Sequence, residues 1–534
     1  MSEYLAAPVD PAGGPTFALR GRIVTMNDHA GVVDGVVYVR GGSIAAVLDR
    51  QEPAPAGFET LKVLETKGTI YPGLIDLHDH LSYNALQLWD VPKKYANRDQ
   101  WAKGDTYRKL ITGPMKVLGR TPEYVPAIVR FVECKCLVGG TTTAQGIALA
   151  SNAGIQRYYR GVVRNVEQTD EPALPEAATH ISDVEAKDRE KFLKRLRSVD
   201  CLLLHLSEGV DDAARQHFLD LKAPDDTWAL AGSLAGIHCV ALRREDFEVL
   251  AHAGGAMIWS PLSNLLLYGK TADVAAARSE GVVVALGPDW SPSGSKNLLG
   301  ELKLARLVSS LGGHGLSDFE LLSLATRSAA SILRWDKAVG TIEVGKRADL
   351  LVVRGTDGEA HAHLFSRGED DVELVVVNGF PRYGAAEPMK RLLGADAPKA
   401  ERAEVAGRQR LLALTQASGD PVVSGLTLKR ARELLTDGLK RLPELVKNLD
   451  RLQLDPDALR LVLDHEDEEE LELRPRLGST DGAPLEAAST PLPDLLVPLE
   501  LDALTVGDDD RFVDALAKQK NLPPEVSAHV PELF

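Results

Sequence analysis

The order of apolar runs along the middle of the chain constrains the fold most. Between residues 73 and 286, short apolar runs alternate with longer stretches of helical spacing, which is typical of a parallel α/β sheet or barrel. A closed barrel needs about eight strands, and one is expected in an irregular piece near Ala173–Ile181. The other seven are Gly73–Leu77, Thr141–Gly146, Gly161–Val166, Cys201–Leu206, Ala235–Val240, Ala256–Trp259 and Val282–Leu286.

Strand-like sequence flanks this region on both sides. Residues 17–70 contain short alternating strands and turns, and the same pattern returns at residues 340–384. Each flank is too short to bury a core of its own. We therefore predict one β-domain made of the two flanks, with an α/β barrel (residues 71–339) inserted into it.

Residues 396–534 form a third zone, which we expect to be mostly helical and acidic. Residues 426–452 have helical apolar spacing, residues 464–473 are a dense acidic run, and a short helix is expected near residues 509–518. The acidic run is typical of a solvated or flexible segment. With no catalytic constellation there, the extension has no assigned role and is expected to be dispensable for the site.

The charge balance excludes some classes of partner. The chain has 61 Lys+Arg and 77 Asp+Glu, a net charge of −16, which argues against nucleic-acid binding through phosphates and against docking on an anionic membrane. It contains no apolar run long enough for a membrane span and begins without a signal-peptide pattern. Four cysteines in 534 residues are no disulfide framework. We expect a cytoplasmic protein, and the sequence permits a homo-oligomer.

The sharpest motif is YPGLIDLHDH, residues 71–80, at the end of the first run. Residues two apart on a strand point to the same face, so His78 and His80 can reach one cation together. Neutral imidazole suits zinc. Because two histidines do not fill a coordination shell, further ligands must come from other strand ends.

Candidates stand at the ends of three later runs: His205, His238 and Asp289. Barrel enzymes place their sites at this end of the strands. One histidine there is more often a hydrogen-bonded core residue, but the whole set is hard to explain by chance packing. Glu208, three residues after His205, could exchange a proton with a water above the metal. The alternative for Glu208 is a carboxylate that stabilises a helix start.

These motifs carry a family resemblance. PGLIDLHDH, HLSEG, GIHCVAL, SPLSN, LGPD and GTIEVGKRADLLVV together resemble the amidohydrolase superfamily, over about residues 17–384. The branch most similar contains cytosine and guanine deaminases, triazine hydrolases and imidazolonepropionase. The resemblance implies a distorted (β/α)8 TIM barrel with a composite β-sandwich.

The resemblance also implies roles for the candidate residues. The metal ligands would be His78, His80, His205 and Asp289, with Asp289 also accepting a proton. The catalytic roles would fall to Glu208 as proton shuttle and His238 as the residue that orients the water, together with Asp289.

Two-metal members of the family carry a carboxylated lysine on the fourth strand. Residues 160–168 (RGVVRNVEQ) contain no lysine, and Lys187 lies in a polar helical stretch. We therefore expect one divalent ion, most simply Zn2+, with Fe2+ or Mn2+ also compatible with these ligands.

Several further residues are open to two interpretations. Trp89, Tyr95 and Trp101 lie in the long loop after His80, where they would contact substrate or, more simply, anchor the loop. Asp76 and Asn264 are candidates for orienting the ligands.

A second His-x-His pair, His361 and His363, follows a turn and is expected to lie in a surface loop. Trp290 departs from the family, which has a small residue after the last aspartate.

The function we expect is metal-dependent hydrolysis of non-peptide C–N bonds in a small molecule, through a metal-activated water. Deamination of an amino-heterocycle and hydrolysis of a cyclic or linear amide both remain open, with deamination slightly favoured by the single metal and the His-x-x-Glu motif. An alternative of another class is a non-catalytic metal-binding or scaffold protein on this fold, with residues 396–534 as its interaction surface. The intact set of candidate residues counts against it.

Overall fold

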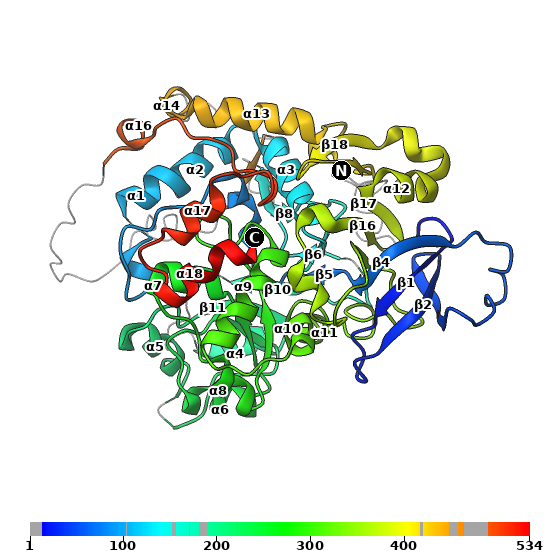
Figure 1. Cartoon of the computed structure of the whole chain (residues 1–534). Coiled ribbons are helices and arrows are strands. Elements are labelled where there is room, and N and C mark those ends of the chain that lie inside the picture. The colour runs from blue at the N-terminus through cyan, green and yellow to red at the C-terminus, as the bar shows by residue number, and fades with distance from the viewer. Residues whose placement is uncertain are drawn as a thin grey trace, which may run out of the picture.

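The computed structural model describes residues 13–102, 104–151, 156–169, 171–180, 189–223, 225–416, 420–447, 458–463 and 490–534 (Figure 1). Most of the described strands fall into one large antiparallel-rich sheet and two parallel sheets. A small sheet holds β7 (Ala148–Ser151), β8 (Gln156–Tyr158) and β20 (Leu459–Leu461).

The large sheet combines strands from both ends of the region that resembles the family. It has nine strands in the order β18-β19-β17-β16-β15-β4-β1-β2-β3, and β4 pairs antiparallel with β15 from Pro72↔Leu350 to Gly68↔Arg354. The two flanks thus share one sheet. Its strands are β1 (Phe17–Val24), β2 (Val32–Arg40), β3 (Ser43–Asp49), β4 (Leu64–Pro72), β15 (Leu350–Arg354), β16 (Val372–Val377), β17 (Phe380–Ala385), β18 (Glu401–Val405) and β19 (Arg408–Leu412).

Parallel strands hold the centre of the molecule. One sheet has the order β5-β6-β9 and the other β10-β11-β12-β13-β14. The fourth of these strands, β10, falls inside the irregular piece where the sequence predicts it, and it pairs parallel with β11. The strands are β5 (Leu74–Ile75), β6 (Thr141–Ala144), β9 (Arg164–Asn165), β10 (Ala177–His180), β11 (Cys201–Leu206), β12 (Leu234–His238), β13 (Ala256–Trp259) and β14 (Val283–Leu286).

Backbone hydrogen bonds join the two parallel sheets at both edges. The amide of Ala177, in β10, donates to the carbonyl of Val166 over 2.8 Å, just after β9. At the other edge, Asp79 and Asp289 form a parallel bridge between the segments that follow β5 and β14. The carboxyl ends of the first and last strands are therefore neighbours, which brings His78 and Asp289 together.

The helices lie between and around the strands (Figure 1). Local sequence fixes several starts: Asn297 caps α9 by accepting from the Gly300 amide, and Ser317 with Glu320 forms a capping box on α10. The sequence around Lys187 and after it predicts a helix over residues 183–197, of which α4 covers residues 189–196, and residues 181–188 lie outside the described part. The helices are α1 (Asp105–Tyr107), α2 (Gly113–Arg120), α3 (Val125–Val138), α4 (Arg189–Leu196), α5 (Asp212–Leu219), α6 (Arg244–His252), α7 (Pro261–Tyr268), α8 (Val274–Ser279), α9 (Leu298–Leu311), α10 (Asp318–Leu324), α11 (Arg327–Ile332), α12 (Ala386–Leu393), α13 (Leu428–Lys440), α14 (Leu442–Leu445), α16 (Leu492–Leu495), α17 (Phe512–Ala517) and α18 (Pro524–Leu533).

The third zone is built differently from the expected helical module. Its first part contributes β18 and β19 to the large sheet, because arginine-rich alternating sequence around a Gly407 turn forms a hairpin there. Helix α13 packs on α3, and α18 packs on α9, so both ends of the zone lie on the core (Figure 1). The predicted acidic run at residues 464–473 lies outside the described residues.

No helix in the described ranges is long and apolar enough to span a bilayer. All four cysteines are buried and free of disulfides.

Candidate metal centre

Four side chains from the carboxyl ends of the parallel strands converge on one point. They are His78, His205, His238 and Asp289, all buried, and one potential ligand atom from each lies within 4.8 Å of the others. His205 lies within β11, His238 ends β12, and His78 and Asp289 follow β5 and β14. Sequence analysis predicted this convergence from the positions of the residues at strand ends.

His80 lies at the rim of the same cluster. Its Nε2 is 3.3 Å from Oδ1 of Asp289, and its ring centroid is 4.8 Å from that of His78 and 5.3 Å from that of His205. The group of four described above contains His238, whereas the resemblance implies His80 as the fourth ligand. The rings of both histidines lie beside those of His78 and His205, with centroids 4.8–5.3 Å apart.

The backbone at the strand ends adopts conformations that non-glycine residues rarely take. His238 has φ 68° and Asp289 has φ 72°, and Ser207, between His205 and Glu208, has φ 51°. Such strain is typical of functional sites, where the surrounding structure holds it in place. Here it turns the side chains of the strand ends toward one another.

The protonation states suit a cation. Burial lowers the pKa of His78 to about 4 and that of His205 well below its usual range, so both rings are neutral at pH 7. Burial alone would raise the pKa of Asp289, but the adjacent His78 and His80 side chains outweigh it and leave that pKa well below its usual range. Neutral imidazoles beside an ionised carboxylate are the donor set of a divalent metal.

Several buried side-chain atoms of the described residues have no hydrogen-bond partner, and the cluster contains two of them, Nε2 of His78 and Nδ1 of His205. A buried polar atom without a partner costs free energy. The presence of two such atoms in a ring of ligand-type side chains fits a site built to hold a divalent ion.

Polar neighbours orient the candidate ligands. Nδ1 of His238 lies 3.0 Å from Oδ1 of Asn264, and Nδ1 of His78 lies 3.1 Å from Oε1 of Gln145. Both amide oxygens accept, so each ring donates from Nδ1 and turns Nε2 toward the cluster. Ser263 donates to Oδ2 of Asp289 over 2.5 Å.

Asn264 therefore contacts a candidate site residue, as expected, whereas the Asp76 carboxylate accepts from the backbone amide of His78 over 3.1 Å. Sequence reasoning missed Gln145 and Ser263. Gln145 stands near the end of the run Thr141–Gly146, so the strand-end rule that found the histidines would also have found it.

Glu208 lies beside the cluster. Its Oε2 is 3.8 Å from Nε2 of His238 and 3.9 Å from Nη1 of Arg98. Tyr268 donates to Oε1 over 2.7 Å, and Trp101 in turn donates to the Tyr268 hydroxyl over 2.9 Å. The sequence missed Tyr268 and Arg98, because neither belongs to a motif.

The helix after this loop excludes the alternative role for Glu208. That helix, α5, begins at Asp212, and the carboxylate of Asp211 caps it by accepting from the Ala214 amide. Glu208 therefore does not stabilise the helix start. It is buried and aimed at the cluster.

The aromatic loop after His80 is anchored on the core. Trp89, Tyr95 and Trp101 are all buried, at 2%, 6% and 4% exposure, and the amide of Tyr95 donates to the carbonyl of Leu267 over 2.8 Å. Anchoring is thus the role that the structure supports. Trp290 closes the site from the last strand, with its ring 5.4 Å from that of His80.

The second His-x-His pair takes no part in the site. His363 is buried rather than in a surface loop, and its ring nitrogens each lie 3.0 Å from a backbone carbonyl, of Asp357 and of Arg354. His361 contacts Glu359 instead. The turn that precedes the pair folds back over His363, which buries it.

Comparison with known proteins places this site in a family. The profile of the amidohydrolase family matches residues 69–380, more than half of the chain and all of the cluster. The chain belongs to the amidohydrolase family. This membership, together with the named relatives described below, shows that the chain is a hydrolase of carbon–nitrogen bonds other than peptide bonds.

Curated relatives carry two different names. The 5-methylthioadenosine/S-adenosylhomocysteine deaminase of Thermoanaerobacter pseudethanolicus is 24% identical over 354 residues, 59% of this chain and 81% of that protein. The protein of the same name from Caldanaerobacter subterraneus is 37% identical over 153 residues, 27% of this chain and 35% of its own length. The imidazolonepropionase of Halobacterium salinarum is 27% identical over 407 residues, 66% of this chain and 92% of that protein.

Solved structures share the fold. The triazine hydrolase from Arthrobacter aurescens has a TM-score of 0.54 and 21% identity, covering 68% of this chain and 94% of that one. The guanine deaminase of E. coli has a TM-score of 0.50 and 18% identity, covering 69% and 99%. Like the sequence relatives, both leave a substantial part of the present chain uncovered.

Proposed function

We propose that this amidohydrolase deaminates an amino-heterocycle with one bound divalent ion, most simply zinc. The observation that carries the proposal is the buried Glu208 carboxylate beside the cluster of three histidines and Asp289. The relatives named as deaminases of adenine-containing thioethers, and the guanine deaminase that shares the fold, support it.

The residues that would hold the ion are His78, His80, His205 and Asp289. When bound, a divalent ion supplies Lewis acidity, and it lowers the pKa of a coordinated water from 15.7 toward about 7. We keep His238 outside the ligand set, because its Nδ1 is fixed by Asn264 and its Nε2 also faces Glu208 at 3.8 Å.

Glu208, His238 and Asp289 would then have separate roles in proton transfer and in binding the water. Glu208, held by the Tyr268 hydroxyl, is placed to take a proton and deliver it to a ring nitrogen or to the departing amine. His238, whose Nδ1 is held by Asn264, would hydrogen-bond the water through Nε2, as electrostatic stabilisation. Asp289 stays ionised beside His78 and His80, so it can accept the first proton.

The scaffold for this chemistry follows from the sheet edges. We infer that the two parallel sheets form one distorted (β/α)8 barrel, because backbone contacts join β9 to β10 and the segment after β5 to that after β14. The nine-stranded sheet would then correspond to the composite β-sandwich domain. Residues 71–339 would be the catalytic domain.

A single ion is supported by the fourth strand. The described strand β10, Ala177–His180, has the sequence AATH and offers no lysine for carboxylation. We therefore propose a mononuclear site.

Metal analysis and a substrate panel test the proposal together. We expect elemental analysis to find one divalent ion per chain, and ammonia release from amino-purines, amino-pyrimidines or their nucleosides. Two ions per chain would refute the mononuclear site. A metal-loaded protein that releases no ammonia from these but opens cyclic amides would refute deamination.

Hydrolysis of a cyclic or linear amide is the second candidate. The imidazolonepropionase of Halobacterium salinarum matches more of the chain than the deaminases do, 66% against 59% for that of Thermoanaerobacter pseudethanolicus. The same panel, extended to cyclic amides and read as ring opening, distinguishes the two. A scaffold role would be supported if folded, metal-loaded protein turned over neither class.

A further inference from the structure

We propose that Asp502, in the C-terminal extension, is a positioning residue that holds together two loops of the metal site. The inference rests on the proposed function, since it concerns the site's affinity for its ion. Asp502 lies more than 200 residues after the last candidate ligand, Asp289, and outside the region matched by the family profile.

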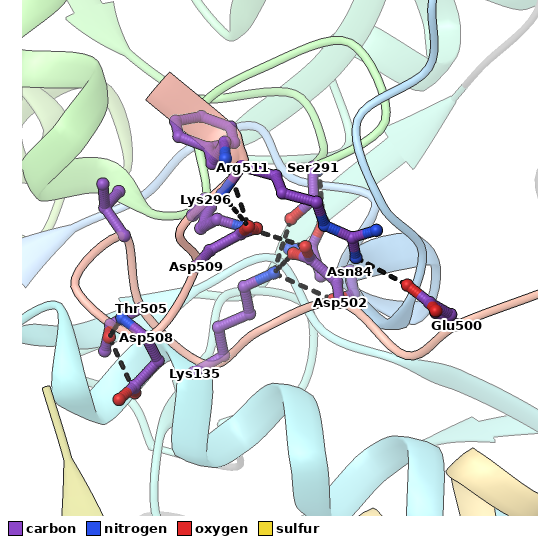
Figure 2. A network of polar contacts seen from close by, with 12 residues as sticks. Asn84, Lys135, Ser291, Lys296, Glu500, Asp502, Thr505, Asp508, Asp509 and Arg511 are labelled. Atoms are coloured by element: carbon purple, nitrogen blue, oxygen red, sulfur yellow. Dashed lines mark hydrogen bonds and ion pairs between the residues drawn. The ribbon is translucent and has the colours of Figure 1, made fainter. Parts of the chain in front are cut away.

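Asp502 is buried between two lysines. It is 2% exposed, its Oδ2 is 2.5 Å from Nζ of Lys135 in α3, and its Oδ1 is 2.5 Å from Nζ of Lys296 (Figure 2). Asp509 adds a second carboxylate to Lys296 at 2.8 Å. A buried lysine is costly without an anionic partner, so the extension supplies what these two core residues require.

The first lysine connects Asp502 to the loop that carries two candidate ligands. Nζ of Lys135 donates to the carbonyl of Asn84 over 2.9 Å. The side chain of Asn84 donates to both carboxylate oxygens of Asp79, over 2.9 and 3.0 Å. Asp79 stands between His78 and His80. In addition, the amide of Asp502 donates to the carbonyl of Ala85 over 2.9 Å.

The same lysine reaches the loop that carries Asp289. Nζ of Lys135 donates to Oγ of Ser291 over 2.8 Å, and the amide of Ser291 donates to Oδ1 of Asn84 over 2.7 Å (Figure 2). Ser291 follows Asp289 by two residues, and Lys296 lies in the same loop. Through Lys135, the Asp502 carboxylate is therefore linked both to the loop after the first parallel strand, β5, and to the loop after the last, β14.

Further contacts extend this hold to neighbouring elements. The side chain of Gln519 donates to the carbonyl of Trp89 over 3.1 Å, and that of Asn521 donates to the carbonyl of Leu266 in α7 over 2.7 Å. Helix α7 carries Ser263 and Asn264, which contact Asp289 and His238. The extension thus lies against three elements that bear site residues.

This arrangement changes the expectation for the extension. Without the extension, Lys135 and Lys296 would lose the carboxylates of Asp502 and Asp509 as partners. Asn84 and Ser291 would then contact a buried Lys135 that lacks its hydrogen-bonded carboxylate. The sequence suggested a dispensable tail because all candidate ligands precede it. The structure makes it a part of the site's support.

The test compares full-length variants by the release of bound Co2+. Asp502→Asn removes the charge and keeps the shape, whereas Ser291→Ala removes one partner of Lys135 and is expected to fold. We expect release to a chelator about tenfold faster in Asp502→Asn, the lower end of the effect of groups that orient ligands, and a smaller acceleration in Ser291→Ala. The visible d–d spectrum should shift in both, as the ligand geometry loosens.

Two controls separate positioning from general stability. Glu500→Gln alters an exposed carboxylate two residues away, whose side chain is 64% exposed and forms an ion pair with Arg511. Asp509→Asn removes the outer ionic partner of Lys296, a side chain that is 12% exposed and also accepts from the amides of Arg511 and Phe512. Both should release Co2+ at the wild-type rate and keep its spectrum, even if Asp509→Asn lowers the melting temperature.

The outcomes are distinct. If Asp502→Asn and Ser291→Ala fold and keep the wild-type spectrum and release rate, the positioning role is refuted while the metal site stands. If Asp502→Asn does not fold, Ser291→Ala decides by the same two readouts. If the wild-type protein takes up no Co2+, the proposed metal site itself fails, and the positioning role with it.

Discussion

Two buried polar clusters in this molecule differ in whether their polar groups have partners. In one, Arg164 of β9 forms a bidentate contact with Asp349 and donates to Thr143 and Asn378, and the Asn378 amide donates to Asp349 over 2.7 Å. This cluster ties a parallel strand to the large sheet, and each charge has an opposite partner.

The metal cluster has the opposite character. Nδ1 of His205 has no hydrogen-bond partner among the described residues, and His238 and Asp289 hold left-handed backbone conformations. Asn378 also has a positive φ, of 52°, but asparagine tolerates that conformation. The comparison teaches that the structural cluster pairs its charges with one another, whereas the metal cluster keeps a buried ring nitrogen without a hydrogen-bond partner among the described residues.

Removing a candidate ligand should have the largest effect. In His205→Ala we expect metal affinity to fall by more than about 100-fold, beyond the 10–100-fold typical of outer partners, and turnover to be lost. Because the removed ring nitrogen lacks a partner, the metal-free protein should lose less stability than Arg164→Met does. Metal titration and thermal melts check both points. His252→Ala, at an exposed histidine, is the control, and retained metal would contradict the ligand assignment.

Glu208→Gln should separate the chemistry from metal binding. Turnover should fall by about 10²–10⁴-fold, the contribution of a general acid/base, while one ion per chain remains. Steady-state kinetics and elemental analysis on the same sample measure this. Glu245→Gln, 62% exposed in its side chain, should act as wild type. Loss of the ion would instead make Glu208 a ligand.

Arg164→Met tests the satisfied cluster. Removing one partner of a buried pair leaves the other charge unpaired, so the free energy of unfolding should fall by about 3–5 kcal/mol. The folded fraction should still bind its ion. Denaturant unfolding measures the change, with Arg244→Met, 64% exposed, as the matched surface variant. A loss below 1 kcal/mol would show that charge satisfaction is not what distinguishes this cluster.

Tyr268→Phe should have the smallest effect. It removes the hydroxyl that donates to Glu208 over 2.7 Å, and we expect about a tenfold fall in turnover, since a hydrogen bond to a charged group is worth about 1.5–3 kcal/mol. Metal content should be unchanged. Steady-state kinetics measure this fall. Tyr124→Phe, whose hydroxyl contacts Asp437, is the control, and unaltered turnover would remove Tyr268 from the proton path.

Much of the site could be predicted because it depends on a local rule. Parallel strands in one sheet end at the same edge, so polar residues at the ends of apolar runs must meet there. That rule found His78, His80, His205, His238 and Asp289. The strand β10, where the sequence pattern is weak, was located instead by the count of about eight strands that a closed barrel needs.

The orienting residues were only partly within reach of that rule. Asn264 was found through its motif, and Gln145 could have been found at its strand end. Tyr268 could not, because it ends a helix that is buried on all sides and shows no polar face. Its contact with Glu208 depends on the tertiary packing that brings the end of α7 next to the loop that follows β11.

By itself, then, the sequence determined the order of strands and helices and the residues that their ends bring together, since both follow from apolar periodicity and strand direction. Only the tertiary structure decided where residues 490–534 lie and which groups they satisfy. Lys135 looks like any helical lysine, and Asp502 like any aspartate in an acidic tail. Their contact spans 367 residues. No local pattern encodes such a pairing, because it depends on which surfaces remain uncovered once the rest of the core has formed.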